Sequence, residues 1–89
     1  MFVSVIHRIV DFEGFFGAAA SVTDMLPADL QLPQHFTSVD HATAICLWEA
    51  PSADRVKELL EPLIGRYSAN EYSEVVAEYS AGLPAAAHV

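Results

Sequence analysis

The feature that most constrains the fold of this chain is a run of five apolar residues, Ala44–Trp48, followed almost at once by a helical pattern. Side chains of a strand point alternately to the two faces of its sheet, so a run that is apolar at every position makes both faces apolar. Pro51 ends this strand, and Ser52 is a favourable N-cap for the next helix. Both faces of the sheet therefore need a cover.

Strand and helix patterns alternate along the chain. Apolar residues at helical spacing predict two helices, which begin after the N-caps Asp11 and Ser52, and Pro62 predicts that the second helix ends near Glu61. Runs rich in β-branched and aromatic residues predict four strands, at Phe2–Val10, Gln34–Val39, Ala42–Ala50 and Asn70–Tyr79. The predicted order is therefore βαββαβ.

This order, with right-handed crossovers, is typical of a ferredoxin-like α+β sandwich. Such a fold has a four-stranded antiparallel sheet with the first and third strands at its centre and two helices on one face. In the third strand Ile45 and Leu47 point to one face, whereas Ala44, Cys46 and Trp48 point to the other. Because two helices cover one face only, we expect a second copy to cover the other in a sheet-to-sheet homodimer.

The length of 89 residues predicts one domain at residues 1–79 and a flexible tail at residues 80–89. A domain of this size has little stability to spare, although 53% of its residues are hydrophobic. Cys46 is the only cysteine, so no disulfide within the chain adds stability, and a lone thiol in an apolar strand fits a reducing cytoplasm. Self-association is the remaining common source of additional stability for so small a domain.

The charge of the chain excludes some classes of partner. Twelve acidic residues against four basic ones give a formal net charge of −8, which repels phosphate backbones and anionic membrane surfaces. Apolar runs are too short to span a bilayer, and no basic segment of a secretory signal precedes the first strand. We therefore expect a cytoplasmic protein that binds neither nucleic acid nor membrane.

Four short motifs carry a resemblance to known proteins. They are His7-Arg8 with Asp11-Phe12, the strand-to-helix junction Cys46–Ser52, the pair Glu61-Pro62, and the final strand Asn70–Val75. Together they resemble the dimeric α+β barrel superfamily, and within it a family of small uncharacterised bacterial proteins. The junction also resembles a small nickel-binding actinobacterial group of the same fold. The resemblance implies the ferredoxin-like fold and the homodimer, but no single activity, because the superfamily includes monooxygenases, isomerases, haem-degrading enzymes and cyclases.

His7 is the polar residue with the clearest chemical potential. It lies among apolar residues of a predicted central strand, where an imidazole can act as a general base, a metal ligand or a hydrogen-bond partner of a ligand. A neutral core histidine held by one local acceptor is the commoner alternative. We name His7 as the candidate catalytic residue.

A cavity between sheet and helices is the predicted ligand site, with Gly14 and Gly17 leaving room beside the phenylalanines of the first helix. Aromatic residues at these spacings are more often core residues. The candidate ligand-binding residues are His7, Phe15, Phe36, Trp48 and Tyr72.

A metal site is an alternative built on His7 and His35, because imidazole suits nickel or zinc. The sequence has no HxH, HxxxH or HExxH spacing, so no metal or other cofactor is the first expectation and nickel the alternative. Cys46 has no basic neighbour in sequence, which predicts an inert core thiol.

Three functions stay open at this point. The first is a homodimeric module that binds a small apolar or metabolite-like ligand, and it needs only the cavity. The second is a cofactor-independent enzyme of the monooxygenase, cyclase or isomerase type that uses His7. The third is a histidine-based nickel or other metal-binding dimer. The binding module ranks first because the sequence shows no convergent set of acid and base residues, and whether the chain is an enzyme stays open.

Overall fold

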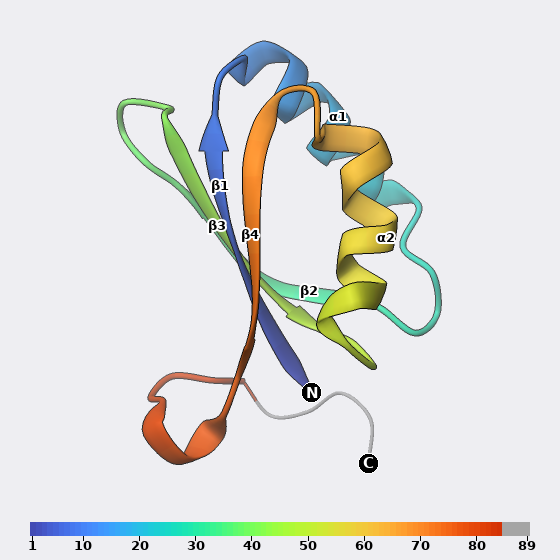
Figure 1. The fold of residues 1–89 in the computed structure, drawn as a ribbon, viewed down its shortest axis with the longest axis vertical. Helices are drawn as coiled ribbons and strands as arrows, with labels where there is room; N and C mark the ends of the chain where they lie inside the picture. The colour runs from blue at the N-terminus through green and yellow to red at the C-terminus, as the bar shows by residue number, and fades with distance from the viewer. Residues whose placement is uncertain (85–89) are drawn as a thin grey trace.

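The computed structural model describes residues 1–84 and confirms the βαββαβ order (Figure 1). The elements are β1 (Phe2–Ile9), α1 (Phe12–Asp24), β2 (Gln31–Thr37), β3 (Thr43–Glu49), α2 (Ala53–Ile64), β4 (Ser68–Val75) and a 3₁₀ turn, η1 (Ala77–Tyr79). Within these residues, the helices of 13 and 12 residues fall short of the length and apolarity needed to cross a membrane.

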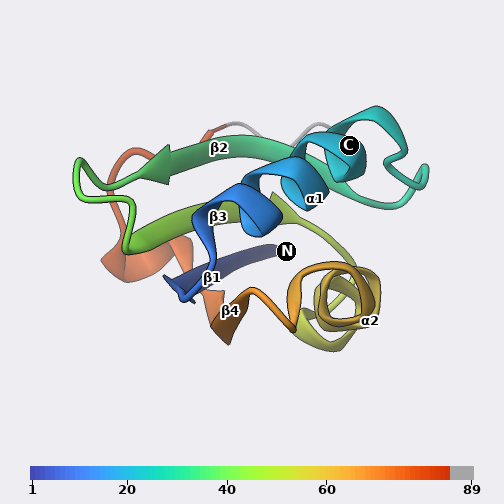
Figure 2. The same cartoon turned by 90° about the horizontal axis from the view of Figure 1, so that it is seen from above.

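The four strands form one antiparallel sheet in the order β2-β3-β1-β4, as the ferredoxin-like prediction requires. In Figure 2 α1 is seen along its length and α2 nearly end-on, so the two helices cross at an angle. Along β1, Val3, Val5 and His7 are buried in turn, because they point to the face that the helices cover. The core lies on this covered face and joins β1 to Trp48 of β3 and Leu60 of α2.

Helix α1 begins where the sequence predicts. The Asp11 side chain accepts a hydrogen bond from the Gly14 backbone N–H at 3.1 Å, which satisfies one of the free donors of the first turn. Gly14 packs against the Tyr67 ring so closely that any Cβ at this position would collide with it. Gly14 therefore serves the contact with the α2–β4 connection, whereas a Cβ at Gly17 would meet nothing within 4 Å.

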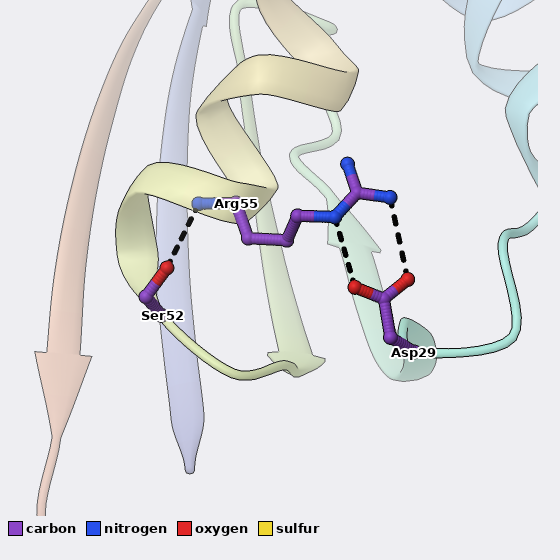
Figure 3. A network of polar contacts seen from close by, with 3 residues as sticks. All are labelled: Asp29, Ser52 and Arg55. Carbon is purple, nitrogen blue, oxygen red and sulfur yellow. Dashed lines mark hydrogen bonds and ion pairs between the residues drawn. The ribbon is translucent and has the colours of Figure 1, made fainter.

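Helix α2 begins at the predicted N-cap, where the Ser52 hydroxyl oxygen accepts from the Arg55 N–H at 3.1 Å. The Arg55 side chain also forms an ion pair with Asp29, with 2.9 Å between Nε and Oδ2, which ties the start of α2 to the α1–β2 connection (Figure 3). The predicted end near Glu61 is wrong, because the helix continues through Pro62 to Ile64. Proline removes one donor in the last turn, and burial of the Ile64 side chain favours the added residues.

All four strands differ from their predicted bounds: β1 ends one residue early, β3 is one residue shorter at each end, and β2 and β4 differ by more. Strand β2 starts at Gln31, three residues early, and accommodates Pro33 at an irregularity between Gln31 and Gln34 on the edge of the sheet, a place where proline is tolerated. Strand β4 runs from Ser68 to Val75, so the segment predicted to extend it to Tyr79 forms η1 instead.

The second face of the sheet, which we call the open face, carries apolar side chains as predicted. Phe36 and Ile45 pair across β2 and β3 on this face and stay 62% and 46% exposed. Residues 80–83 line a groove of about 320 Å³ on the open face, and the Gln34 side-chain amide donates to the Gly82 carbonyl at 3.4 Å. The first part of the predicted tail thus contacts the sheet, and residues 85–89 lie outside the described residues.

Candidate functional site

A set of hydrogen-bonded side chains, which we call the buried polar cluster, lies on the covered face of the sheet. Its members come from four elements, β1, β3, α2 and β4, and they are His7, Cys46, Glu61, Asn70 and Tyr72. His7 is directly opposite Asn70 of β4 and opposite Ala44 of β3, so Cys46, two residues along β3, points to the same face. The register of the central strands therefore brings the cluster together.

Asn70 fixes the state of the His7 ring. Its amide nitrogen donates to a Glu61 carboxylate oxygen at 2.8 Å and to the Ser68 carbonyl at 3.1 Å, so its amide oxygen is the acceptor. The His7 Nδ1–H donates to this oxygen at 2.6 Å. The other ring nitrogen, Nε2, then carries the lone pair, and the Cys46 Sγ lies 3.3 Å from it. In this tautomer the thiol is the donor and the imidazole the acceptor.

Glu61 closes the other end of the cluster. One of its carboxylate oxygens accepts hydrogen bonds from the Asn70 amide and from the Tyr72 hydroxyl. Glu61 lies in the last turn of α2, so the cluster ties that helix to β4. A carboxylate with two donors on one oxygen is a firm anchor for the Asn70 amide, and through it for the His7 ring.

Burial favours the uncharged forms of His7, Cys46 and Tyr72. Only 1% of the His7 side chain is exposed, and this burial lowers its pKa, against the hydrogen bond to Asn70 and the Glu61 charge, which raise it. Burial also raises the pKa of the Cys46 thiol to about 12. Burial and the contact with Glu61 raise the pKa of Tyr72. At pH 7 the pair is a neutral thiol facing a neutral imidazole.

An apolar pocket of about 260 Å³, which we call the outer pocket, lies between α1 and the β2–β3 edge of the sheet. It is lined by Phe15, Phe16, Ala19, Ala20, Thr23, Leu32, His35, Phe36, Thr37, Ala44 and Cys46. No Asp, Glu, Lys or Arg of the described residues lines it. A pocket of this composition suits a neutral ligand with most of its surface apolar.

A smaller space of about 30 Å³, which we call the inner cavity, lies deeper against the sheet. His7, Trp48 and Leu60 line it, and it shares Phe15, Ala19, Leu32 and Cys46 with the outer pocket. The buried indole Nε1–H of Trp48 has no hydrogen-bond partner among the described residues. A buried donor in this state favours an acceptor atom held close to it.

The structure places the five predicted ligand-binding residues in two groups. Phe15 and Phe36 line the outer pocket, and His7, Phe15 and Trp48 line the inner cavity. The Phe15 ring lies against the His7 ring, with 5.1 Å between centroids. Tyr72 lines neither space, and its hydroxyl is held by Glu61 instead.

The two histidines of the metal alternative lie in different environments. His7 is buried with both ring nitrogens in contact with Asn70 and Cys46, whereas His35 is exposed at the outer pocket. Within residues 1–84, no group of three or more His, Cys, Asp or Glu side chains is placed to hold a metal ion. The geometry gives His7 hydrogen-bonding partners, and it adds nothing in favour of the nickel alternative.

Sequence reasoning named His7 but missed the residues around it. Cys46, Asn70 and Glu61 were assigned to a core strand, a final strand and a helix end without chemical roles. One signal was available: a polar residue on a central strand needs partners on both neighbouring strands, and the antiparallel register puts Asn70 and the stretch around Cys46 there. Glu61 is different, because only the path of α2 brings it near β4.

Comparison with known proteins yields no match: no protein-family model, no curated protein and no solved structure matches the chain. The α+β fold with its four-stranded antiparallel sheet therefore stands on the structure itself. The more specific resemblance to a bacterial family, and to its nickel-binding relatives, stays a prediction from the sequence motifs. Arguments about function accordingly depend on the buried polar cluster and the two spaces beside it.

Proposed function

We propose that this protein is a homodimeric module that binds a small, neutral, largely apolar molecule in the outer pocket. The observation that carries this proposal is the pocket of about 260 Å³ between α1 and the sheet, lined by apolar side chains with a few polar groups. The inner cavity, with the free Nε1–H of Trp48, favours a ligand that carries a hydrogen-bond acceptor at one end.

In this proposal the protein selects its ligands mainly by their charge and prefers neutral molecules. The net charge of −8 repels anions, and the lining offers a cation no carboxylate among the described residues. A neutral aromatic compound with one oxygen substituent is therefore the class of ligand to test. The lone thiol fits a reducing compartment, and the cytoplasm is the compartment that we propose.

Titration of isotope-labelled protein with 2-naphthol, followed by amide NMR, tests the binding proposal. We expect saturable shifts at residues of the outer pocket. Ala20→Trp places an indole at the exposed rim of this pocket and should weaken binding at least about tenfold. Ser21→Trp, one residue further on the exposed surface of α1, is the matched control and should bind as the wild type does. Equal affinity in the two variants would refute the assignment of the pocket.

The dimer proposal concerns the open face. Phe36 and Ile45 leave an apolar pair exposed on it, and a second copy of the same face would bury this pair. Sedimentation at micromolar concentration should give a dimer. Ile45→Lys should give monomers, whereas Val39→Lys, at a fully exposed position in the β2–β3 connection, should not. A wild-type protein that sediments as a monomer would contradict the proposal.

A further inference from the structure

We propose that Cys46 is a nucleophile, with His7 as its base and Asn70 as the residue that positions the base, and that it accepts acyl groups from small neutral esters. The inference deepens the proposed function and rests on it, because the ester must enter the outer pocket. The three residues form a chain of hydrogen bonds, with 3.3 Å between Cys46 Sγ and His7 Nε2 and 2.6 Å between His7 Nδ1 and Asn70 Oδ1.

This hydrogen-bonded chain contains the three groups that an activated nucleophile needs. A weak nucleophile requires a base within hydrogen-bond reach, and that base requires a third group that holds its tautomer and orientation. Asn70 supplies the third part, since its amide oxygen accepts from Nδ1 and leaves the Nε2 lone pair facing the thiol. Glu61 in turn fixes which way the Asn70 amide points. A neutral core histidine would need none of this arrangement beyond one acceptor.

The position of Cys46 makes it accessible to a ligand. The residue is half-buried and lines both the outer pocket and the inner cavity, whereas His7 lines the inner cavity only. A ligand in the outer pocket therefore reaches the thiol while the base stays behind it, away from solvent. Lack of charged lining residues among those described restricts the acyl donor to neutral compounds.

The reaction balances with an ester and water alone. As Sγ bonds to the carbonyl carbon, the thiol proton passes to His7 Nε2. The tetrahedral oxyanion collapses with loss of the alcohol, which takes that proton from Nε2. Water then attacks the thioester, Nε2 accepts a proton from it, and the carboxylic acid leaves as Sγ regains the proton. Trp48 lines the same inner cavity, and its buried Nε1–H, which has no partner among the described residues, is the donor that we assign to the oxyanion.

Burial of the thiol shapes what this nucleophile can do. Because the thiol is neutral at rest, it has no preformed thiolate, and its reactivity depends on proton transfer to His7 in the reaction itself. Loss of His7 should therefore slow the reaction far more than it would for an exposed thiol. This dependence separates the proposal from simple reactivity of a surface cysteine.

The test uses p-nitrophenyl acetate, with release of nitrophenolate and intact mass spectrometry as the two measurements. We expect a burst of about one nitrophenolate per protomer and one acetyl group on Cys46. Cys46→Ala should abolish both. His7→Gln should slow acetylation at least about 100-fold. His41→Gln is the matched control, since His41 is an exposed histidine in the β2–β3 connection that lines neither the outer pocket nor the inner cavity, and it should leave the rate unchanged. Acetylation of Cys46 at the wild-type rate in His7→Gln overturns the proposal.

Asn70→Ser gives a second test that does not require a change in the buried ring. It should slow acetylation at least about tenfold while the affinity for 2-naphthol stays unchanged, a split that a purely structural role of Asn70 does not predict. Equal loss of both would overturn the positioning role. Bound 2-naphthol without any acetylation refutes the nucleophile and leaves the binding function intact. Acetylation undiminished in Ala20→Trp means that the ester does not enter by the outer pocket, and refutes the inference together with the proposed route.

Discussion

Helices α1 and α2 occupy equivalent places in the two halves of the fold, but they fit the sheet differently. Both begin at a side-chain N-cap, Asp11 or Ser52. Helix α1 has two buried residues, whereas α2 has three although it is one residue shorter. The difference follows from sequence, because the middle of α1 is a run of glycine and alanine, Gly17–Ala20, that fills little space beneath it.

This comparison explains why the binding space and the reactive groups lie where they do. The outer pocket opens under α1, where small side chains leave room. The buried polar cluster runs from Cys46, which lines that pocket, to Glu61 of α2, which holds Asn70 in place through a hydrogen bond of 2.8 Å. A loosely fitted helix supplies the space for a ligand, and a tightly fitted one supplies the fixed geometry that chemistry requires.

The largest expected effect is a loss of stability from a buried residue of α2, the helix that fits the sheet tightly. Leu60 of α2 is 4% exposed, so Leu60→Ala should lower the free energy of unfolding by about 2–5 kcal/mol. Phe16 of α1 is 60% exposed beside the outer pocket, and Phe16→Ala should change it by no more than about 0.5 kcal/mol. Urea unfolding at one protomer concentration measures both. Equal losses would mean that the two helices do not differ in fit.

A somewhat smaller effect is expected where α2 holds the cluster. Glu61→Ala removes the acceptor of the Asn70 amide and the Tyr72 hydroxyl, and it should cost about 1–3 kcal/mol of unfolding free energy. Glu58→Ala, at an exposed position one turn earlier, should change it by about 0.5 kcal/mol or less. If the two variants lose the same stability, the Glu61 contacts contribute nothing beyond the charge of the helix surface.

Sequence reasoning predicted the sheet and the helix starts, and the reason is local. Asp11 and Ser52 cap their own helices, and the alternation in β1 follows from strand geometry, so neighbouring residues carry the information. The end of α2 was wrong because burial of Ile64 outweighed the local effect of Pro62. The cluster was missed for a similar reason, since Cys46 and Asn70 have chemical meaning only once the register sets them beside His7.

Acid should weaken the cluster through His7. In the unfolded chain the pKa of this histidine is near its ordinary value of 6.5, and in the folded protein burial lowers this pKa, so between the two values only the unfolded chain binds the proton. The contribution of His7 to the unfolding free energy should therefore be fully present above about pH 7 and should fall as the pH drops toward about 5. Around the ring, Asn70 and Cys46 contact its two nitrogens, and the charge of Glu61 acts against the lowering of the His7 pKa.

The control for this effect is His7→Gln, whose unfolding free energy should change less between the same two pH values. Asp29 and Asp40 do not interfere, because hydrogen bonds from Arg55 and Ser38 hold their pKa values below the ordinary value of 3.8, and their contribution is lost only at lower pH. Urea unfolding at several pH values measures the slope. Parallel slopes in the wild type and His7→Gln would mean that the folded protein binds the proton as readily as the unfolded chain.

The smallest effect is expected at the ion pair that joins the two halves. Arg55 and Asp29 lie 2.9 Å apart between Nε and Oδ2, but their side chains are 31% and 43% exposed, so water screens the attraction and ordering two side chains offsets it (Figure 3). Asp29→Asn should lower the thermal midpoint only slightly, and the difference should vanish at about 1 M salt, where the Debye length is roughly 3 Å. A large decrease in the thermal midpoint that persists at high salt would mean that the α1–β2 connection packs against α2 and is not held there by charge alone. That connection would then have to be counted as a structural element that stabilises both helices, beside the difference between α1 and α2.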